Sequence, residues 1–92
     1  SGSILTTYST KDANYTLTDS DSTIECITNS FTITLPTAVG ILGKVYVIKN
    51  TGLGAIIIDA NGTETIDGEL TQTITQWDAI WIQSNGNNWV II

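Results

Sequence analysis

The chain has 92 residues, which is the length of a single domain. It carries three lysines, no arginine and nine carboxylates, so its net charge of −6 makes nucleic acid and anionic membrane surfaces poor partners. No apolar run approaches the ~20 residues of a membrane span, and no signal peptide is visible. The fifteen Ile and sixteen Thr are branched at Cβ, which disfavours helix and suits a pleated sheet, so the composition predicts an all-β fold.

The first thirteen residues show no clear hydrophobic period. Ser1-Gly2-Ser3 is typical of a remnant of a cloning vector, and the remainder of residues 1–13 is interpreted as a linker or a lead-in strand. We therefore place a β-sandwich domain at residues 14–92, and we expect the chain to be a fragment of a longer protein.

Apolar and polar residues alternate through the next three segments, as they do in strands with one buried face. Pro36 ends the third segment because it has no N–H to donate to a ladder. The single cysteine, Cys26, has no partner for an internal disulfide and is interpreted as a small buried apolar residue. The predicted inward residues of these segments are Tyr15, Leu17, Ile24, Cys26, Phe31, Ile33 and Leu35.

Residues 45–48 and 55–59 are apolar on both faces, and a strand of that kind is normally covered on both sides. Asn-Gly and Asp-Gly pairs predict tight turns at 61–62, 67–68 and 85–86, since both central positions of such a turn favour φ > 0. Further strands are predicted at 63–66, 69–77, 78–84 and 88–92.

About eight to nine short strands, with frequent turn signals between them, are typical of a sandwich or barrel. The predicted fold class is an all-β, antiparallel, jelly-roll-like β-sandwich that forms a trimer. A prism and a barrel remain open as alternatives.

The residue types that usually perform catalysis are scarce in this chain. There is no His, Cys26 has no His partner, and the serines lie in turn-like contexts. The carboxylates of the later turns could supply the facing pair that a glycosidase needs, but turn structure explains them more simply. They are Asp59, Glu64, Asp67 and Glu69. The sequence therefore predicts a protein that is not an enzyme.

The same segment begins with the spacing of an EF-hand loop, which needs Gly at the sixth position and Glu at the twelfth. With Asp59 as the first position, the sixth is Glu64 and the twelfth is Leu70, so the match fails. We predict no metal site and no cofactor, and a surface calcium held by loop oxygens remains an alternative.

Three tryptophans, Trp77, Trp81 and Trp89, lie in the last sixteen residues. The leading interpretation places them in the core. A second is an exposed surface on which flat rings and neutral amides bind a sugar, and a third is a subunit interface. That candidate glycan surface comprises Trp77, Trp81, Gln83, Asn87, Asn88 and Trp89.

The chain ends on Val90, Ile91 and Ile92, whereas a free C-terminus is usually frayed and solvated. Together with the segments that are apolar on both faces, this ending predicts a surface covered by sister copies of the chain. The candidate trimer interface comprises Tyr46, Ile48, Leu53, Val90, Ile91 and Ile92.

Several short motifs follow one another through the domain: Leu35-Pro36, "GKVYVIKN" at 43–50, "IIID" at 56–59, "IDG" at 66–68 and "SNGNNWVII" at 84–92. In this order, residues 14–92 resemble a recurrent module of bacteriophage and large-virus fibre proteins. The resemblance implies a small β-sandwich at the end of a tail fibre, head fibre or collagen-like stalk, commonly trimeric and without a shared catalytic motif. Cys26 departs from the pattern, because such modules often have an aliphatic residue there.

The resemblance and the apolar surfaces together predict a viral structural protein on the virion surface, outside the cell. We expect it to hold three chains together as a homotrimer and to present a surface to a host glycan or protein receptor. The alternative is a monomeric carbohydrate-binding module of a larger secreted protein.

Overall fold

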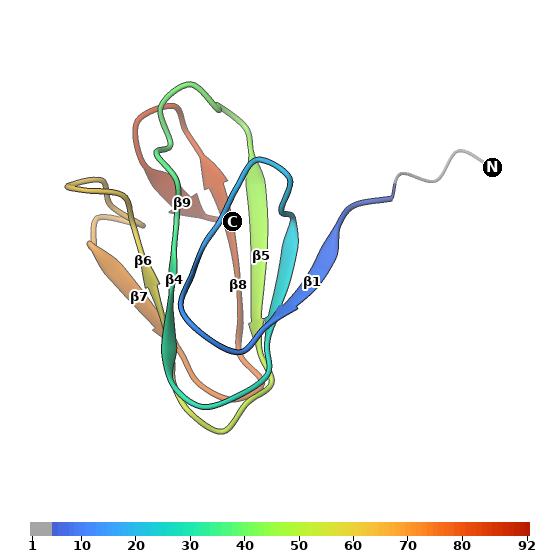
Figure 1. Cartoon of the computed structure of the whole chain (residues 1–92). Coiled ribbons are helices and arrows are strands. Elements are labelled where there is room, and N and C mark those ends of the chain that lie inside the picture. Colours follow the sequence, from blue (N-terminus) through green and yellow to red (C-terminus); the bar gives the residue numbers. More distant parts are fainter. Residues whose placement is uncertain (1–4) are drawn as a thin grey trace.

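The computed structural model describes residues 5–92, which form two facing β-sheets (Figure 1). The strands are β1 (Tyr8–Lys11), β2 (Tyr15–Thr16), β3 (Thr23–Cys26), β4 (Phe31–Thr34), β5 (Val45–Asn50), β6 (Ile56–Asp59), β7 (Thr71–Ile74), β8 (Ala79–Ser84) and β9 (Trp89–Ile91). The five-stranded sheet has the order β1-β3-β5-β8-β9, and the four-stranded sheet has the order β2-β4-β6-β7. The part of the chain from residue 5 onward contains no helix, and hence none that could cross a membrane.

From β1 to β6 the chain winds between the two layers, because each strand lies in the sheet opposite to the one before it. Strands that become neighbours in this way run parallel, as β1, β3 and β5 do in one sheet and β2, β4 and β6 in the other. The last three strands return antiparallel: β7 beside β6, β8 beside β5, and β9 beside β8.

The predicted all-β fold is therefore confirmed, and its predicted antiparallel arrangement is wrong, since both sheets are mixed. The physical reason is that alternation in a sequence reports which face of a strand is buried and not the direction of its neighbour. The initial segment, interpreted as a linker or lead-in strand, contains β1, whereas the suggested vector remnant lies outside the described residues.

The core lies between the two sheets and consists mainly of isoleucine. Ile24, Ile48 and Ile80 stand opposite one another across β3, β5 and β8, and all three are buried. Ile56 and Ile74 do the same across β6 and β7 in the other layer. Each such side chain contributes roughly 1.5–3 kcal/mol by leaving water. The inward positions predicted from alternation are confirmed, with Tyr15 and Phe31 only partly buried at the margin of the core.

The connection between β6 and β7 differs from the predicted strand at 63–66. Residue Ile66 makes only isolated bridges, and β7 is shorter than the strand predicted over 69–77. The predicted tight turn at Asp67-Gly68 is present, with φ of 50° and 85° at its two positions, as a type I′ turn requires. Ile66 and Glu69 exchange backbone hydrogen bonds of 2.7 and 3.1 Å across it.

The edge strand β1 carries polar residues at the positions that face inward. Ser9 and Lys11 stand in register with the buried Ile24 and Cys26 of β3. The ammonium of Lys11 lies 3.7 Å from the centre of the Tyr15 ring in β2, which is the edge strand of the other sheet. A charge at an inward position discourages another strand from adding to the edge.

One end of the fold is closed by Asn50, the last residue of β5, whose side chain is fully buried. Its amide nitrogen donates to the carbonyl oxygens of Gly54 (2.8 Å) and Ile74 (3.0 Å), and its amide oxygen accepts from the Gly52 N–H (3.0 Å). A Cβ at Gly52 would lie 1.9 Å from the carbonyl oxygen of Thr28, so only glycine fits there. The β5–β6 loop is thus clamped between the β3–β4 loop and the end of β7.

The opposite end is closed by Asp21, a buried carboxylate in the β2–β3 connection. Its Oδ2 accepts from the hydroxyl of Tyr15 (2.8 Å) and from the N–H (2.9 Å) and hydroxyl (3.1 Å) of Thr18. The carbonyl oxygen of Thr18 accepts in turn from the buried Tyr46 hydroxyl (2.8 Å). Burial alone raises the pKa of Asp21, but the hydrogen bonds from Thr18 and Tyr15 and the nearby Lys11 charge together hold that pKa below its ordinary value.

Replacing Asn50 with Ala removes the donor to the carbonyls of Gly54 and Ile74, whereas the Gly52 N–H keeps the Cys26 carbonyl oxygen as an acceptor (3.2 Å). At about 1–3 kcal/mol for each of the two carbonyls left unsatisfied, we expect Asn50→Ala to lower the free energy of unfolding by about 2–6 kcal/mol. Urea unfolding followed by circular dichroism measures this loss. Asn61→Ala, at an exposed position, is the matched control. Equal midpoints for the two variants would contradict the role given to Asn50.

The lowered pKa of Asp21 means that the folded chain prefers its ionised form. This contribution is complete above the pKa of the unfolded carboxyl, about 3.9, and is lost as the pH falls through the lower pKa of the folded state. We therefore expect the free energy of unfolding to fall in acid below about pH 4, where Glu25 and Asp78 also have lowered pKa values and contribute.

Asp21→Asn should be less stable than the parent at pH 7 and should lose less of its stability between pH 4 and pH 2. Denaturant unfolding at several pH values provides the test. Asp12→Asn changes the net charge equally at an exposed position, so it should follow the parent. If Asp21→Asn lost as much of its free energy of unfolding between pH 4 and pH 2 as the parent does, Asp21 would not be a source of the acid sensitivity.

Candidate functional site

The residues predicted to form one glycan surface lie in separate parts of the structure. Trp81 and Gln83 are on the outer face of β8, Trp77 is in the β7–β8 turn at one end of that strand, and the predicted asparagines are in the β8–β9 loop at its other end (Figure 1). At ~3.4 Å per residue, the length of β8 separates the two ends by roughly 20 Å. The predicted set is therefore not a single site.

Trp89 does not belong to any surface, because only 1% of it is exposed. Its ring packs at 5.5 Å from the ring of Tyr46, tilted by 46°, inside the core. Among the described residues, its indole N–H is the one buried side-chain group without a hydrogen-bond partner. The side chain of Asn88 also has a structural role, since its oxygen accepts from the Thr65 N–H (2.9 Å). The core interpretation thus holds for Trp89, while Trp77 and Trp81 are 64% and 55% exposed.

The predicted trimer interface is corrected in two positions. Tyr46 and Ile48 have no exposed area, because they point into the core of the chain itself and not toward a neighbour. Leu53 is exposed in the β5–β6 loop, far from the C-terminal residues of the set. Val90 is half-buried, and Ile91 and Ile92 are 40% and 61% exposed.

The outer face of the five-stranded sheet carries two rows of mostly apolar side chains, next to a row that includes Glu25 and Lys49. Tyr8, Thr23, Val47 and Trp81 stand opposite one another across β1, β3, β5 and β8. The N–H of Ile92, the residue after β9, donates to the carbonyl oxygen of Trp81 (2.9 Å), so Ile92 continues this row. A second row contains Val45, Gln83 and Val90. We call this surface the Trp81 face and define it as Tyr8, Val45, Val47, Trp81, Val90 and Ile92.

Sequence reasoning identified Trp81, Val90 and Ile92 as surface candidates and missed the other half of the Trp81 face. Val45 and Val47 carried a signal, because they alternate with the buried Tyr46 and Ile48 in a segment that is apolar on both faces. Tyr8 carried none, since the initial segment shows no period.

The outer face of the four-stranded sheet has a different character. Thr32, Ile57 and Thr73 form one row across β4, β6 and β7, and Thr34, Asp59 and Thr71 form the next. Ile57 is the one large apolar side chain in these two rows. The two outer faces of the molecule therefore offer a hydroxyl-rich surface on one side and an apolar surface on the other.

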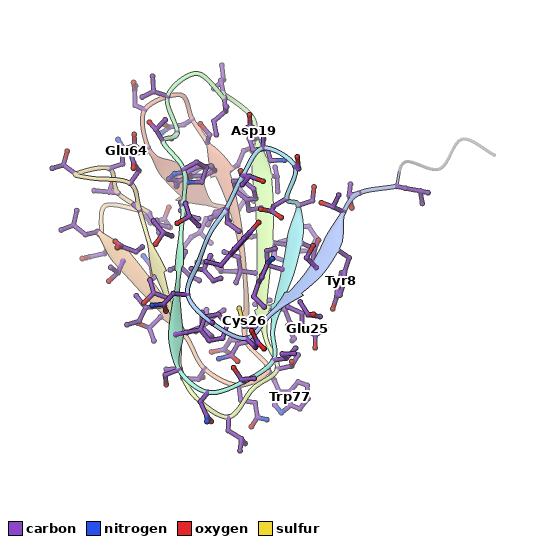
Figure 2. The ribbon with its side chains drawn as sticks, viewed as in Figure 1. Tyr8, Asp19, Glu25, Cys26, Glu64 and Trp77 are labelled. Atoms are coloured by element: carbon purple, nitrogen blue, oxygen red, sulfur yellow. The ribbon has the colours of Figure 1, made fainter. Side chains whose placement is uncertain are left out.

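The β7–β8 turn presents Trp77 at the lower end of the molecule in Figure 2. The N–H of Asp78 donates to the carbonyl oxygen of Thr75 (3.0 Å), so residues 75–78 form a β-turn. Trp77 occupies its third position with φ of 72°, in the left-handed region. Trp77 therefore lies in a turn, although it was included in the strand predicted over 69–77.

Two carboxylates of the predicted turns accept hydrogen bonds from backbone N–H groups of other segments. Glu64 accepts from the Thr37 hydroxyl (2.5 Å) and the Ala38 N–H (2.8 Å), and Asp67 accepts from the Ile91 N–H (2.9 Å). Within residues 5–92 there is no group of metal-ligating side chains that could hold an ion, and no cleft. Glu64 and Asp67 therefore have structural roles in their loops.

Cys26 is buried in β3, and Figure 2 shows it between the two sheets. Burial raises the pKa of its thiol to about 11, with a further contribution from the negative charge of Glu25. Because the thiolate is the reactive form, Cys26 is inert in the folded chain. Its interpretation as a small buried apolar residue is confirmed.

Comparisons of the chain with protein-family models, with curated proteins and with solved structures find no match. The resemblance to fibre modules therefore rests on the motifs of residues 14–92 alone.

We expect Cys26 to react with an aromatic disulfide reagent only as fast as the chain unfolds, because its thiol is buried and protonated at neutral pH. The measurement is the rate of thiol release at pH 8 with and without urea. Complete modification within the mixing time, on a chain whose circular dichroism is unchanged, would contradict the burial of Cys26.

Proposed function

We propose that this chain is a non-catalytic structural domain of a virion fibre, in which copies of the domain associate through the Trp81 face. The observation that carries the proposal is the uncovered apolar surface on the five-stranded sheet, with Trp81 at its centre and Ile92 beside it. Exposed apolar side chains gathered on one face of a domain are typical of a site of association.

The way the edges of the sheets are built favours association through a face. Lys11 points inward on β1, β2 has two residues, and Gln72 points inward on β7, where its amide donates to the carbonyl oxygen of Ile66 (2.9 Å). Polar inward residues and short edge strands are the devices by which proteins avoid edge-to-edge pairing. Copies of the chain would therefore meet through the Trp81 face and not by extending the sheets.

The number of copies, three, comes from the resemblance to trimeric fibre modules. The C-terminal residues support the same surface, since Val90 and Ile92 both belong to the Trp81 face. In a trimer around a fibre axis, this surface would leave water, and the hydroxyl-rich face of the four-stranded sheet would remain outside. The partners proposed for the chain are thus other copies of itself and a receptor on the host surface.

A monomeric carbohydrate-binding module is the second candidate function. The exposure of Trp77 and Trp81 favours it, because flat aromatic rings in water suit the apolar faces of sugars. The two candidates differ in mass, since the module would remain at 9.9 kDa and the fibre domain would form a homotrimer.

We expect native mass spectrometry and sedimentation to give about three times the chain mass of 9.9 kDa at micromolar concentration. Trp81→Glu places a charge at the centre of the Trp81 face and should yield a folded monomer, because an unpaired charge in an interface is costly to desolvate.

Ile57→Glu makes the same kind of change at the exposed apolar residue of the opposite face, and it should leave the trimer intact. A parent chain that is monomeric at high micromolar concentration would overturn the proposal. Equal dissociation of both variants would show that another surface mediates association.

A further inference from the structure

Trp77 has a left-handed backbone conformation, which is unfavourable for a residue with a bulky side chain. Its φ of 72° occupies the third position of the turn at residues 75–78, where a type II turn requires φ > 0 and normally has Gly or Asn. A left-handed backbone is costly for any residue with a Cβ, and most of all for a bulky one. Burial of the ring does not explain the choice of residue, since Trp77 is 64% exposed.

The neighbouring structure holds this turn in place. The N–H of Trp77 donates to the carbonyl oxygen of Asn50 (2.6 Å), and the N–H of Asn50 donates to the carbonyl oxygen of Asp78 (2.9 Å). The ammonium of Lys49 donates to the carbonyl oxygen of Trp77. The carboxylate of Asp78 accepts from the N–H (3.1 Å) and hydroxyl (2.8 Å) of Thr75. A strained conformation that is fixed by several contacts is characteristic of residues that bind or react.

The result is an indole ring that faces water from a fixed backbone, so little backbone freedom is lost when something binds it. The residues around it are mostly uncharged: Gln76 and Thr75 in the same turn, and Thr51 in the next loop, whose carbonyl oxygen faces the Gln76 amide at 3.5 Å. The one cation beside the turn, Lys49, is already engaged by the Trp77 carbonyl. With Asp78 beside the ring and a net charge of −6, an acidic ligand would be repelled.

We propose that the Trp77 turn is a binding site for an uncharged glycan, in which the indole stacks against the apolar C–H face of one pyranose ring. The hydroxyls at the edge of that ring would bond to the amide and hydroxyl groups of the turn. This inference rests on the proposed attachment role and names the class of receptor.

The position of the turn in the fold agrees with such a role. β1 runs toward this end of the five-stranded sheet, since its last residue, Lys11, is in register with Cys26 and Asn50. Residues 5–7 therefore lie at the other end of β1, away from the Trp77 turn (Figure 2). In a fibre whose stalk comes before β1, the Trp77 turn would lie at the end that faces away from the stalk.

The test measures calorimetric binding of soluble oligosaccharides of glucose, galactose, mannose and N-acetylglucosamine to the parent chain and to Trp77→Gly. We expect the parent to bind at least one of these sugars and Trp77→Gly to bind it at least about tenfold more weakly. Glycine relieves the backbone strain, so the variant should melt at the same temperature as the parent or higher. A lower melting temperature would identify Trp77 as a structural residue and overturn the proposal.

Leu53→Ala is the matched control, because Leu53 is also exposed in a loop at this end of the sheets. It should leave sugar binding unchanged, and a loss equal to that of Trp77→Gly would indicate a general apolar surface for a protein partner. Binding of none of the sugars by the parent would also overturn the glycan site. The fibre proposal is judged separately by native mass, which neither Trp77→Gly nor Leu53→Ala should alter.

Discussion

The structure depends on the buried side chain of Asn50. Because the first six strands alternate between the sheets, every loop at this end connects the two layers, and the loops must be held against one another as well as against the core. One amide does this by bonding to Gly52 and Gly54 in its own loop and to Ile74 at the end of β7. A buried polar group of this kind is favourable only when all of its bonds are made, which gives the end of the fold a single arrangement. The close contact of Gly52 with the backbone of Thr28 follows from the same packing.

The protection of the sheet edges explains why association would involve a face of the molecule. The first strands of the two sheets, β1 and β2, are edge strands, and they are protected by the inward Lys11 and by its contact with Tyr15. The remaining surfaces are the two outer faces, and they are not equivalent. One presents threonine hydroxyls with Ile57 among them, and the other presents the Trp81 face. A domain that hides its edges and exposes one apolar face is suited to pack against copies of itself in a defined orientation.

The backbone of Asn50 connects this structural role to the proposed binding role. Its N–H and carbonyl group bond to Asp78 and Trp77, so the residue that closes the core also holds the strained turn. Local preference and tertiary structure disagree at Trp77, where a turn that favours glycine carries the largest side chain. Such disagreements concentrate at functional positions, because the stability that is lost there must be supplied by the rest of the fold. The hydrogen bonds of the turn to Asn50 and Lys49 supply this support.

The sequence by itself determined which residues point inward, because strict alternation in segments such as residues 31–35 requires one buried face. It also determined the Asp67-Gly68 turn and the burial of Cys26, which follow from local backbone preference and residue chemistry. Tertiary structure decided the direction of the strands, since the period of two is the same in parallel and antiparallel pairs. It also decided where the three tryptophans lie and how far each is exposed. Trp89 is buried because it stands opposite Ser84 on the inner face, Trp81 is exposed because it stands opposite Val47 on the outer face, and Trp77 projects from a turn whose conformation no local signal indicates.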